Sequence, residues 1–185
     1  MVEVAVTEPA GLEPSDVHLA EMESLMGSGN SRNAFVVLIG DHFEAPEGTA
    51  TLMVELLEEE GYTVDAVVNT PSVKREIRKA LDTAVVGGAD LVITLGGVGV
   101  GPRAKTPDAT RKILDARLLG MEEAVRAAGL AAGIPEAGLS RGVAGVSGQT
   151  LVVNLAETRA AVRSGMATLC PLVTHVLDDL SRCSV

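Results

Sequence analysis

The segment that decides the fold runs from Leu91 to Lys112 and reads LVITLGGVGVGPRAKTPDATRK. Its first five residues form a continuous apolar run, which is typical of a strand buried on both faces of a parallel sheet. Four glycines among the next six residues allow the chain to turn sharply and to approach a ligand closely. Pro107 then predicts the start of a helix, with Thr106 as its N-cap. A buried strand, a glycine-rich loop and a helix in this order indicate an α/β protein.

The same alternation continues on both sides of this segment. Apolar runs predict further strands at residues 34–40, 62–68 and 151–155. Helical patterns cover residues 49–60, 71–86, 107–128 (with a break near Gly120) and 159–180. The glycine-rich stretch 129–150 is expected to hold a short hairpin or loops. Strands that alternate with helices predict a three-layer α/β/α domain with a mostly parallel sheet.

The first 33 residues differ in composition from the rest of the chain. Glu, Pro, Ser and Gly dominate them, and the stretch Gly27 to Ser31 is typical of a flexible hinge. We therefore predict a flexible acidic tail at residues 1–33 and one domain at residues 34–185. The tail either caps a neighbouring subunit or is mobile, and we favour the second interpretation.

Composition narrows the classes of function. The chain has 185 residues and a formal net charge of −10, which disfavours direct binding to nucleic acid. It has no run of about 18 apolar residues and no apolar run behind a basic start, so neither a membrane span nor a secretory leader is expected. Its two cysteines and three histidines lack the spacing of zinc ligands. We expect a cytoplasmic protein with reduced thiols and no metal held by such ligands.

The candidate site lies where the parallel strands end, because ligands of open α/β sheets bind outside the carboxyl ends of the strands. After the central strand come Gly96, Gly97, Val98 and Gly99. This loop is not followed by Gly-Lys-Ser/Thr and lacks the spacing of a dinucleotide fingerprint. On its own it fits a tight turn and an anion site equally well.

Polar residues follow each of these strands. Arg103, Lys105, Thr106 and Asp108 form either an oxyanion pocket or a solvated helix start. The other candidates each have an ordinary loop or capping role as the alternative. They are Ser140 with Arg141 for an anion, Asn154 with Glu157 at the last strand, and Asp41 for a metal or an amino-pterin contact.

Taken in order, these blocks resemble the MogA/MoaB family of molybdenum cofactor biosynthesis proteins. The family pattern is a strand, then Thr-Thr-Gly-Gly-Thr-Gly, Pro-Arg-Asp, and Thr-Pro-Glu/Asp-Ala-Thr. Further matches are the blocks 120–126, 139–141 and 148–155, so the resemblance covers roughly residues 34–180. It implies a molybdopterin-binding α/β fold, usually trimeric. It also implies that active members use Mg-ATP to transfer AMP to the terminal phosphate of molybdopterin.

The resemblance assigns roles to positions of this chain. The residues implied to be catalytic are Asp41, Asp108 and Glu123. Those implied to bind ligand are Gly96, Gly97, Val98, Gly99, Arg103, Thr106, Pro107, Ser140, Arg141 and Asn154.

Several positions depart from the family pattern. Val98 replaces a threonine, and Ala104 and Thr70 stand where the family has aspartates. Glu157 lies in what is a Pro-Gly-Ser turn in the family. The resemblance therefore implies a molybdopterin-binding protein akin to the adenylyltransferases. The alternative is a catalytically degenerate paralogue that binds the pterin or a regulatory protein partner.

Overall fold

The computed structural model describes residues 32–40 and 48–182. The domain is built on a six-stranded sheet with the order β2-β1-β3-β6-β5-β4. Strands β2, β1, β3 and β6 run parallel, and β5 and β4 add an antiparallel edge. The predicted mostly parallel sheet is thus confirmed. The strands are β1 (Arg32–Ile39), β2 (Tyr62–Thr70), β3 (Leu91–Leu95), β4 (Ala116–Arg117), β5 (Ala144–Ser147) and β6 (Thr150–Leu155).

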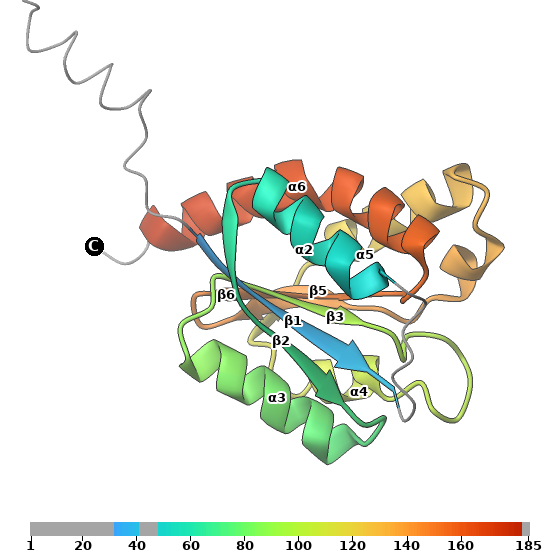
Figure 1. Ribbon diagram of the computed structural model, residues 1–185, viewed down its shortest axis with the longest axis horizontal. Helices are drawn as coiled ribbons and strands as arrows, with labels where there is room; N and C mark the ends of the chain where they lie inside the picture. Colours follow the sequence, from blue (N-terminus) through green and yellow to red (C-terminus); the bar gives the residue numbers. More distant parts are fainter. Residues whose placement is uncertain (1–31, 41–47, 183–185) are drawn as a thin grey trace, which may run out of the picture. The chain divides into compact units, whose positions relative to one another are not determined.

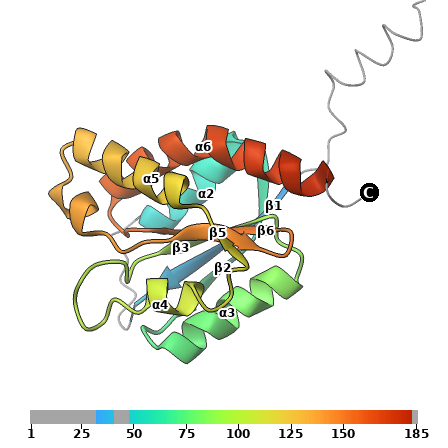
Figure 2. The same cartoon turned by 180° about the vertical axis from the view of Figure 1, so that it is seen from behind.

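Helices cover both faces of the sheet, which confirms the three layers (Figures 1 and 2). Helices α2, α5 and α6 pack on one face, whereas α3 and α4 pack on the other. Their bounds are α2 (Thr49–Glu59), α3 (Lys74–Val86), α4 (Thr106–Thr110), α5 (Leu119–Ala131) and α6 (Arg159–Arg182), with a 3₁₀ turn η1 (Pro135–Leu139) after α5.

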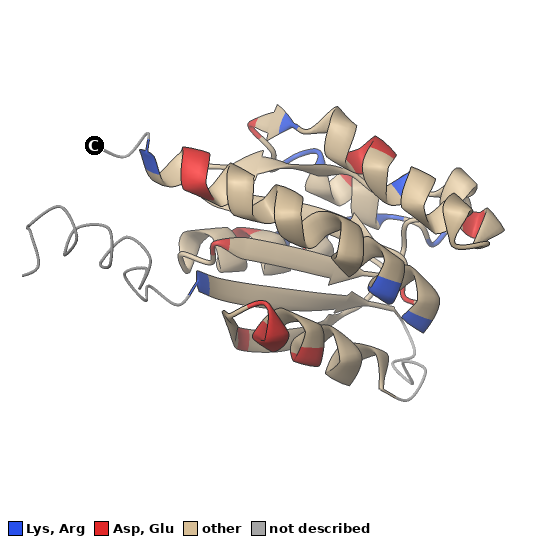
Figure 3. Cartoon of the chain, turned by 90° about the horizontal axis from the view of Figure 1, so that it is seen from above, with Lys and Arg blue, Asp and Glu red and all other residues tan. Residues whose placement is uncertain are grey.

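The core is aliphatic because the chain has only two Phe, one Tyr and no Trp. Successive residues of a strand point to opposite faces. In β1, Val36 joins the cluster under α2 and α6, and Val37 joins the cluster under α3; both are fully buried. Both faces therefore need apolar residues, which explains the continuous apolar runs in the sequence. Figure 3 shows charges on the outer elements, and the central strands β3 and β6 contain none.

The prediction of one long helix from Pro107 toward residue 128 was wrong. Helix α4 ends at Thr110, and the chain then forms the short edge strand β4 before α5 begins. In β4, Ala116 and Arg117 pair with Val146 and Gly145 of β5. Pairing with the sheet edge replaces the helix here, a tertiary effect that the helical pattern of the sequence does not contain.

Two helix starts also differ from expectation. Helix α3 begins at Lys74 instead of Pro71, because Val73 is extended and the Ser72 hydroxyl donates to the Arg103 carbonyl. Thr106 is not an N-cap, since its hydroxyl donates to the carbonyl of Gly96 at 2.9 Å. Strand β1 begins at Arg32, two residues inside the predicted tail, and the boundary at residue 33 stays a prediction.

Within the described ranges, α6 is the one helix that is long and apolar enough to cross a membrane. Its apolar side is used inside this domain, because Val162, Met166, Leu169, Val173 and Leu177 are buried. These residues pack into the core cluster of the sheet. Packing against the sheet therefore accounts for its apolar character.

Candidate ligand-binding site

The loop after β3 turns at two glycines with left-handed backbone angles. Gly96 has a φ of 101° and Gly97 a φ of 65°, a region that residues with a side chain rarely adopt. A Cβ atom on Gly96 would lie 2.6 Å from Glu157 Oε2 and 2.7 Å from the Ile39 carbonyl oxygen. The loop thus needs glycine here, and it brings the ends of β1, β3 and β6 together.

Hydrogen bonds from three other segments fix the loop. The Arg141 amide donates to the Val98 carbonyl at 2.7 Å, and the Thr106 amide donates to the Gly97 carbonyl at 3.3 Å. Farther along, the Ser72 hydroxyl donates to the Arg103 carbonyl. Because the contacts come from the segment before β5, from α4 and from the segment before α3, the loop is held in place before any ligand arrives.

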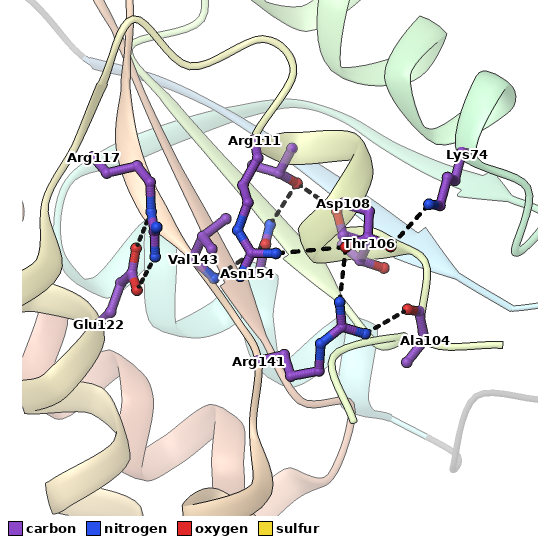
Figure 4. Close-up of polar contacts among 11 residues, drawn as sticks. Lys74, Ala104, Thr106, Asp108, Arg111, Arg117, Glu122, Arg141, Val143 and Asn154 are labelled. Atoms are coloured by element: carbon purple, nitrogen blue, oxygen red, sulfur yellow. Dashed lines mark hydrogen bonds and ion pairs between the residues drawn. The ribbon is translucent and has the colours of Figure 1, made fainter. Parts of the chain in front are cut away.

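A cluster of charges lies beside this loop, and Figure 4 shows its members. One oxygen of Asp108 is 2.9 Å from Lys74 Nζ, and the other is 2.7 Å from an Arg141 nitrogen and 3.5 Å from one of Arg111. The hydrogen bond from Lys74, followed by the attraction of Lys74 and Arg141, holds the pKa of Asp108 below its ordinary value. We call these four residues the Asp108 cluster. Its three cations outnumber its one carboxylate.

Asn154 is the centre of a buried polar network on the α4 side of the sheet. Its side-chain amide donates to Thr94 at 2.9 Å and to Thr110 at 3.0 Å, and its oxygen accepts the Val143 amide at 3.3 Å. Both donor hydrogens of Asn154 are therefore committed inside the protein. The structure thus assigns Asn154 to positioning α4 on strands β3 and β6.

A cavity of about 250 Å³ lies on the α5 and α6 side of the same loop. Val98 and Gly99 of the loop line it, together with residues from α5, η1, the end of β6 and the start of α6. Most of its wall is apolar, and Arg126, Glu136 and Ser140 are among its polar lining residues. A concave, mainly apolar space with a few polar groups is the usual form of a small-molecule site.

A second ion-pair cluster joins α5 to the antiparallel edge. The Glu122 side chain is 3% exposed and receives two hydrogen bonds from Arg117, at 2.8 and 3.1 Å. Arg126 lies 3.9 Å away, and the Ala144 amide donates to Glu122 at 3.3 Å. We call Glu122, Arg117 and Arg126 the Glu122 cluster.

The structure divides the predicted site residues into groups. Gly97, Gly99, Arg103, Ser140 and Arg141 are exposed or half-buried, as ligand contacts need to be. Gly96, Val98, Thr106, Pro107 and Asn154 are buried, although Val98 and Asn154 contribute to the cavity wall.

The three residues implied to be catalytic lie in different surroundings or outside the described part of the chain. Asp108 is ion-paired, Glu123 is exposed on α5 and is not among the cavity-lining residues, and Asp41 lies outside the described residues. Their catalytic roles stay predictions. Sequence reasoning did not select Lys74, Glu122 or Arg126. Arg126 stood in a matched block and could have been chosen, whereas nothing in the sequence marks Lys74.

The family described as "Probable molybdopterin binding domain" matches residues 36–175, which include the glycine loop, both clusters and the cavity. The chain belongs to this family. Its fold and its place in the molybdenum cofactor biosynthesis family, inferred above from ordered motifs, are thereby confirmed.

Individual relatives agree with this assignment. A crystal structure of a molybdopterin biosynthesis protein from Mycobacterium abscessus is 50% identical, with a TM-score of 0.79 over 83% of this chain and 99% of that one. A molybdenum cofactor biosynthesis bifunctional protein of Chlorobaculum tepidum is 31% identical over 78% of this chain. A molybdopterin adenylyltransferase of Helicobacter pylori is 35% identical over 48% of this chain. The chain spans about half the length of these two curated relatives, 47% and 50%.

Proposed function

We propose that this chain binds molybdopterin in the cavity beside the glycine loop and acts in molybdenum cofactor biosynthesis. The observation that carries the proposal is the position of the cavity at the carboxyl ends of β3 and β6, inside the region matched by the family. Its volume of about 250 Å³ is close to the lower end of ligand pockets, roughly 300 Å³, and suits a fused ring system better than a whole nucleotide.

The magnesium ion and ATP implied by the resemblance fit the described residues poorly. Mg²⁺ is usually held through one or two carboxylates together with substrate phosphates. Here Ala104 and Thr70 supply none, and both oxygens of Asp108 already face cations. Residues 32–40 and 48–182 contain no group of three His, Cys, Asp or Glu side chains that could hold a metal.

The ion-paired state of Asp108 favours the second candidate function. A paralogue that holds the pterin without transferring AMP needs the loop and the cavity but no metal-binding carboxylates. The Helicobacter relative is named an adenylyltransferase, so transfer from Mg-ATP stays a prediction for this chain. An assay for adenylylated pterin with Mg-ATP decides between the two candidates.

The binding proposal is tested by filling the cavity. Ala161 lines it from the first turns of α6, whereas its neighbour Ala160 is exposed and does not. We expect Ala161→Leu to weaken molybdopterin binding at least tenfold in calorimetric titration, because the added methyl groups occupy the space of the ring. Ala160→Leu adds the same atoms in the same turn and should bind as the unaltered protein does. Equal affinity of the two variants would contradict the proposed site.

We also propose a cytoplasmic homotrimer, which is carried over from the resemblance. Light scattering after size-exclusion chromatography measures the number of subunits directly. A monomer at micromolar concentration would reject that part of the proposal.

A further inference from the structure

The Asp108 cluster has more positive charge than its internal pairing requires. Lys74, Arg111 and Arg141 surround a single carboxylate, in a chain whose net charge is −10. An ammonium group has three N–H donors and a guanidinium group has five. The cluster uses only part of that capacity, since Lys74 has one ion pair here, and Arg141 bonds to Asp108 and to the Ala104 carbonyl.

These cations are also accessible. The side chains of Lys74, Arg111 and Arg141 are 56%, 37% and 36% exposed. Arg141 lies beside the glycine loop, because its backbone is bonded to Val98 and its guanidinium to Ala104. Lys74 and Arg111 share Asp108 with it. A phosphate group placed against this side of the loop would meet spare donors from two different segments of the chain.

Residue 104 also affects this charge balance. The family pattern has aspartate at this position, where a carboxylate would lie next to the guanidinium of Arg141 and offer a metal ligand. Ala104 is 8% exposed and supplies no charge. Its presence removes a possible magnesium ligand and leaves the neighbouring cations less neutralised.

We propose that this chain holds the phosphate of its ligand by direct contact with Lys74 and Arg141, without a magnesium ion. The inference rests on the proposed function and adds which cations beside the glycine loop neutralise the anion. Charge-assisted hydrogen bonds from Arg and Lys are the ordinary means of binding phosphate where no metal takes part.

Glu157 distinguishes a metal-free phosphate site from one that binds phosphate through a magnesium ion. Its carboxylate lies beside Gly96. If a magnesium ion mediated binding beside Gly96, the Glu157 carboxylate could serve as one of its ligands, and Glu157→Gln would weaken binding. In a metal-free site the same carboxylate repels phosphate, so Glu157→Gln strengthens binding. The two mechanisms therefore predict opposite signs for one substitution.

The experiment is calorimetric titration of the full chain with inorganic pyrophosphate, once in EDTA and once in excess Mg²⁺. We expect binding in EDTA and weaker binding in Mg²⁺, because the ion neutralises the probe. Lys74→Ala should weaken binding in EDTA by about tenfold, the usual effect of losing a charge-assisted hydrogen bond. Arg78→Ala is the matched control, since Arg78 is an exposed cation of the same helix whose partner is Asp82.

A gain of metal dependence completes the test. Ala104→Asp should weaken binding in EDTA and make binding stronger in Mg²⁺ than in EDTA. Binding that requires Mg²⁺ in the unaltered chain, weakening by Glu157→Gln, or no binding in EDTA would each overturn the proposal. Titration with molybdopterin distinguishes failure of the proposed function from failure of the phosphate contact. Pyrophosphate binding without molybdopterin binding would reject the proposed function and leave the phosphate contact intact.

Discussion

The Asp108 and Glu122 clusters are both built on a carboxylate with two arginines, and Lys74 is added only in the first. Each has a carboxylate beside two arginines, and in each an arginine nitrogen approaches within 2.8 Å or less. The side chain of Glu122 is 3% exposed, whereas that of Asp108 is 30% exposed. Glu122 joins α5 to β4 and β5, whereas Asp108 binds Arg141, whose backbone is bonded to the glycine loop.

The difference shows how burial decides the role of an ion pair. A buried carboxylate has lost its hydration, and for Glu122 the Arg117 guanidinium and the Ala144 amide replace the lost water contacts. A half-exposed pair contributes little to stability but keeps donors available for a ligand. We therefore interpret the pair of Glu122 and Arg117 as structural and the Asp108 cluster as a binding surface.

The largest expected effect comes from removing one arginine of each cluster. Arg117 and Arg111 are similarly exposed, at 41% and 37%. Their carboxylate partners differ, because Glu122 is 3% exposed and Asp108 is 30% exposed. Arg117→Met leaves the buried Glu122 with the more distant Arg126 as its cation, and we expect a loss of about 3 kcal/mol in the free energy of unfolding. Arg111→Met should leave that free energy nearly unchanged. Urea denaturation measures both, and equal losses would remove the distinction between the clusters.

A smaller effect is expected from pH. Because Lys74 and Arg141 lower the native pKa of Asp108, the ionised form stabilises the folded state. This contribution is complete above the unfolded pKa of about 4 and is lost as the pH falls through the lower native value. Asp108→Asn should reduce stability at pH 7 and flatten its dependence on pH below about 4. A variant whose acid denaturation curve keeps the shape of the unaltered protein would contradict this assignment.

Salt should produce the smallest change and act on one cluster only. At 1 M ionic strength the screening length is about 3 Å, which weakens interactions between exposed charges but affects buried pairs much less. We expect 1 M NaCl to reduce the stability difference between Asp108→Asn and the unaltered chain. The cost of Arg117→Met should persist in the same buffer. If 1 M NaCl also removed the stability loss caused by Arg117→Met, water would have to reach Glu122.

The sequence by itself determined the central strands and the glycine turn of this protein. Apolar runs such as Leu91–Leu95 mark buried parallel strands, because both faces of such a strand need apolar side chains. Gly96 and Gly97 mark the turn after that strand, since their positive φ angles disfavour other residues. The order of the motifs along the chain then indicated the family, because that order can be read from the sequence without the structure.

Only the tertiary structure decided which distant residues meet. Lys74 and Arg141 lie 34 and 33 residues from Asp108, and they converge because the order of the strands brings α3, α4 and the segment before β5 to one edge. Likewise, pairing with β5 replaced the helix expected at Ala116 and Arg117 by a strand. Which of the neighbours Glu122 and Glu123 is buried depended on the side of α5 that faces the sheet. Local patterns specify elements, whereas contacts between elements depend on their packing.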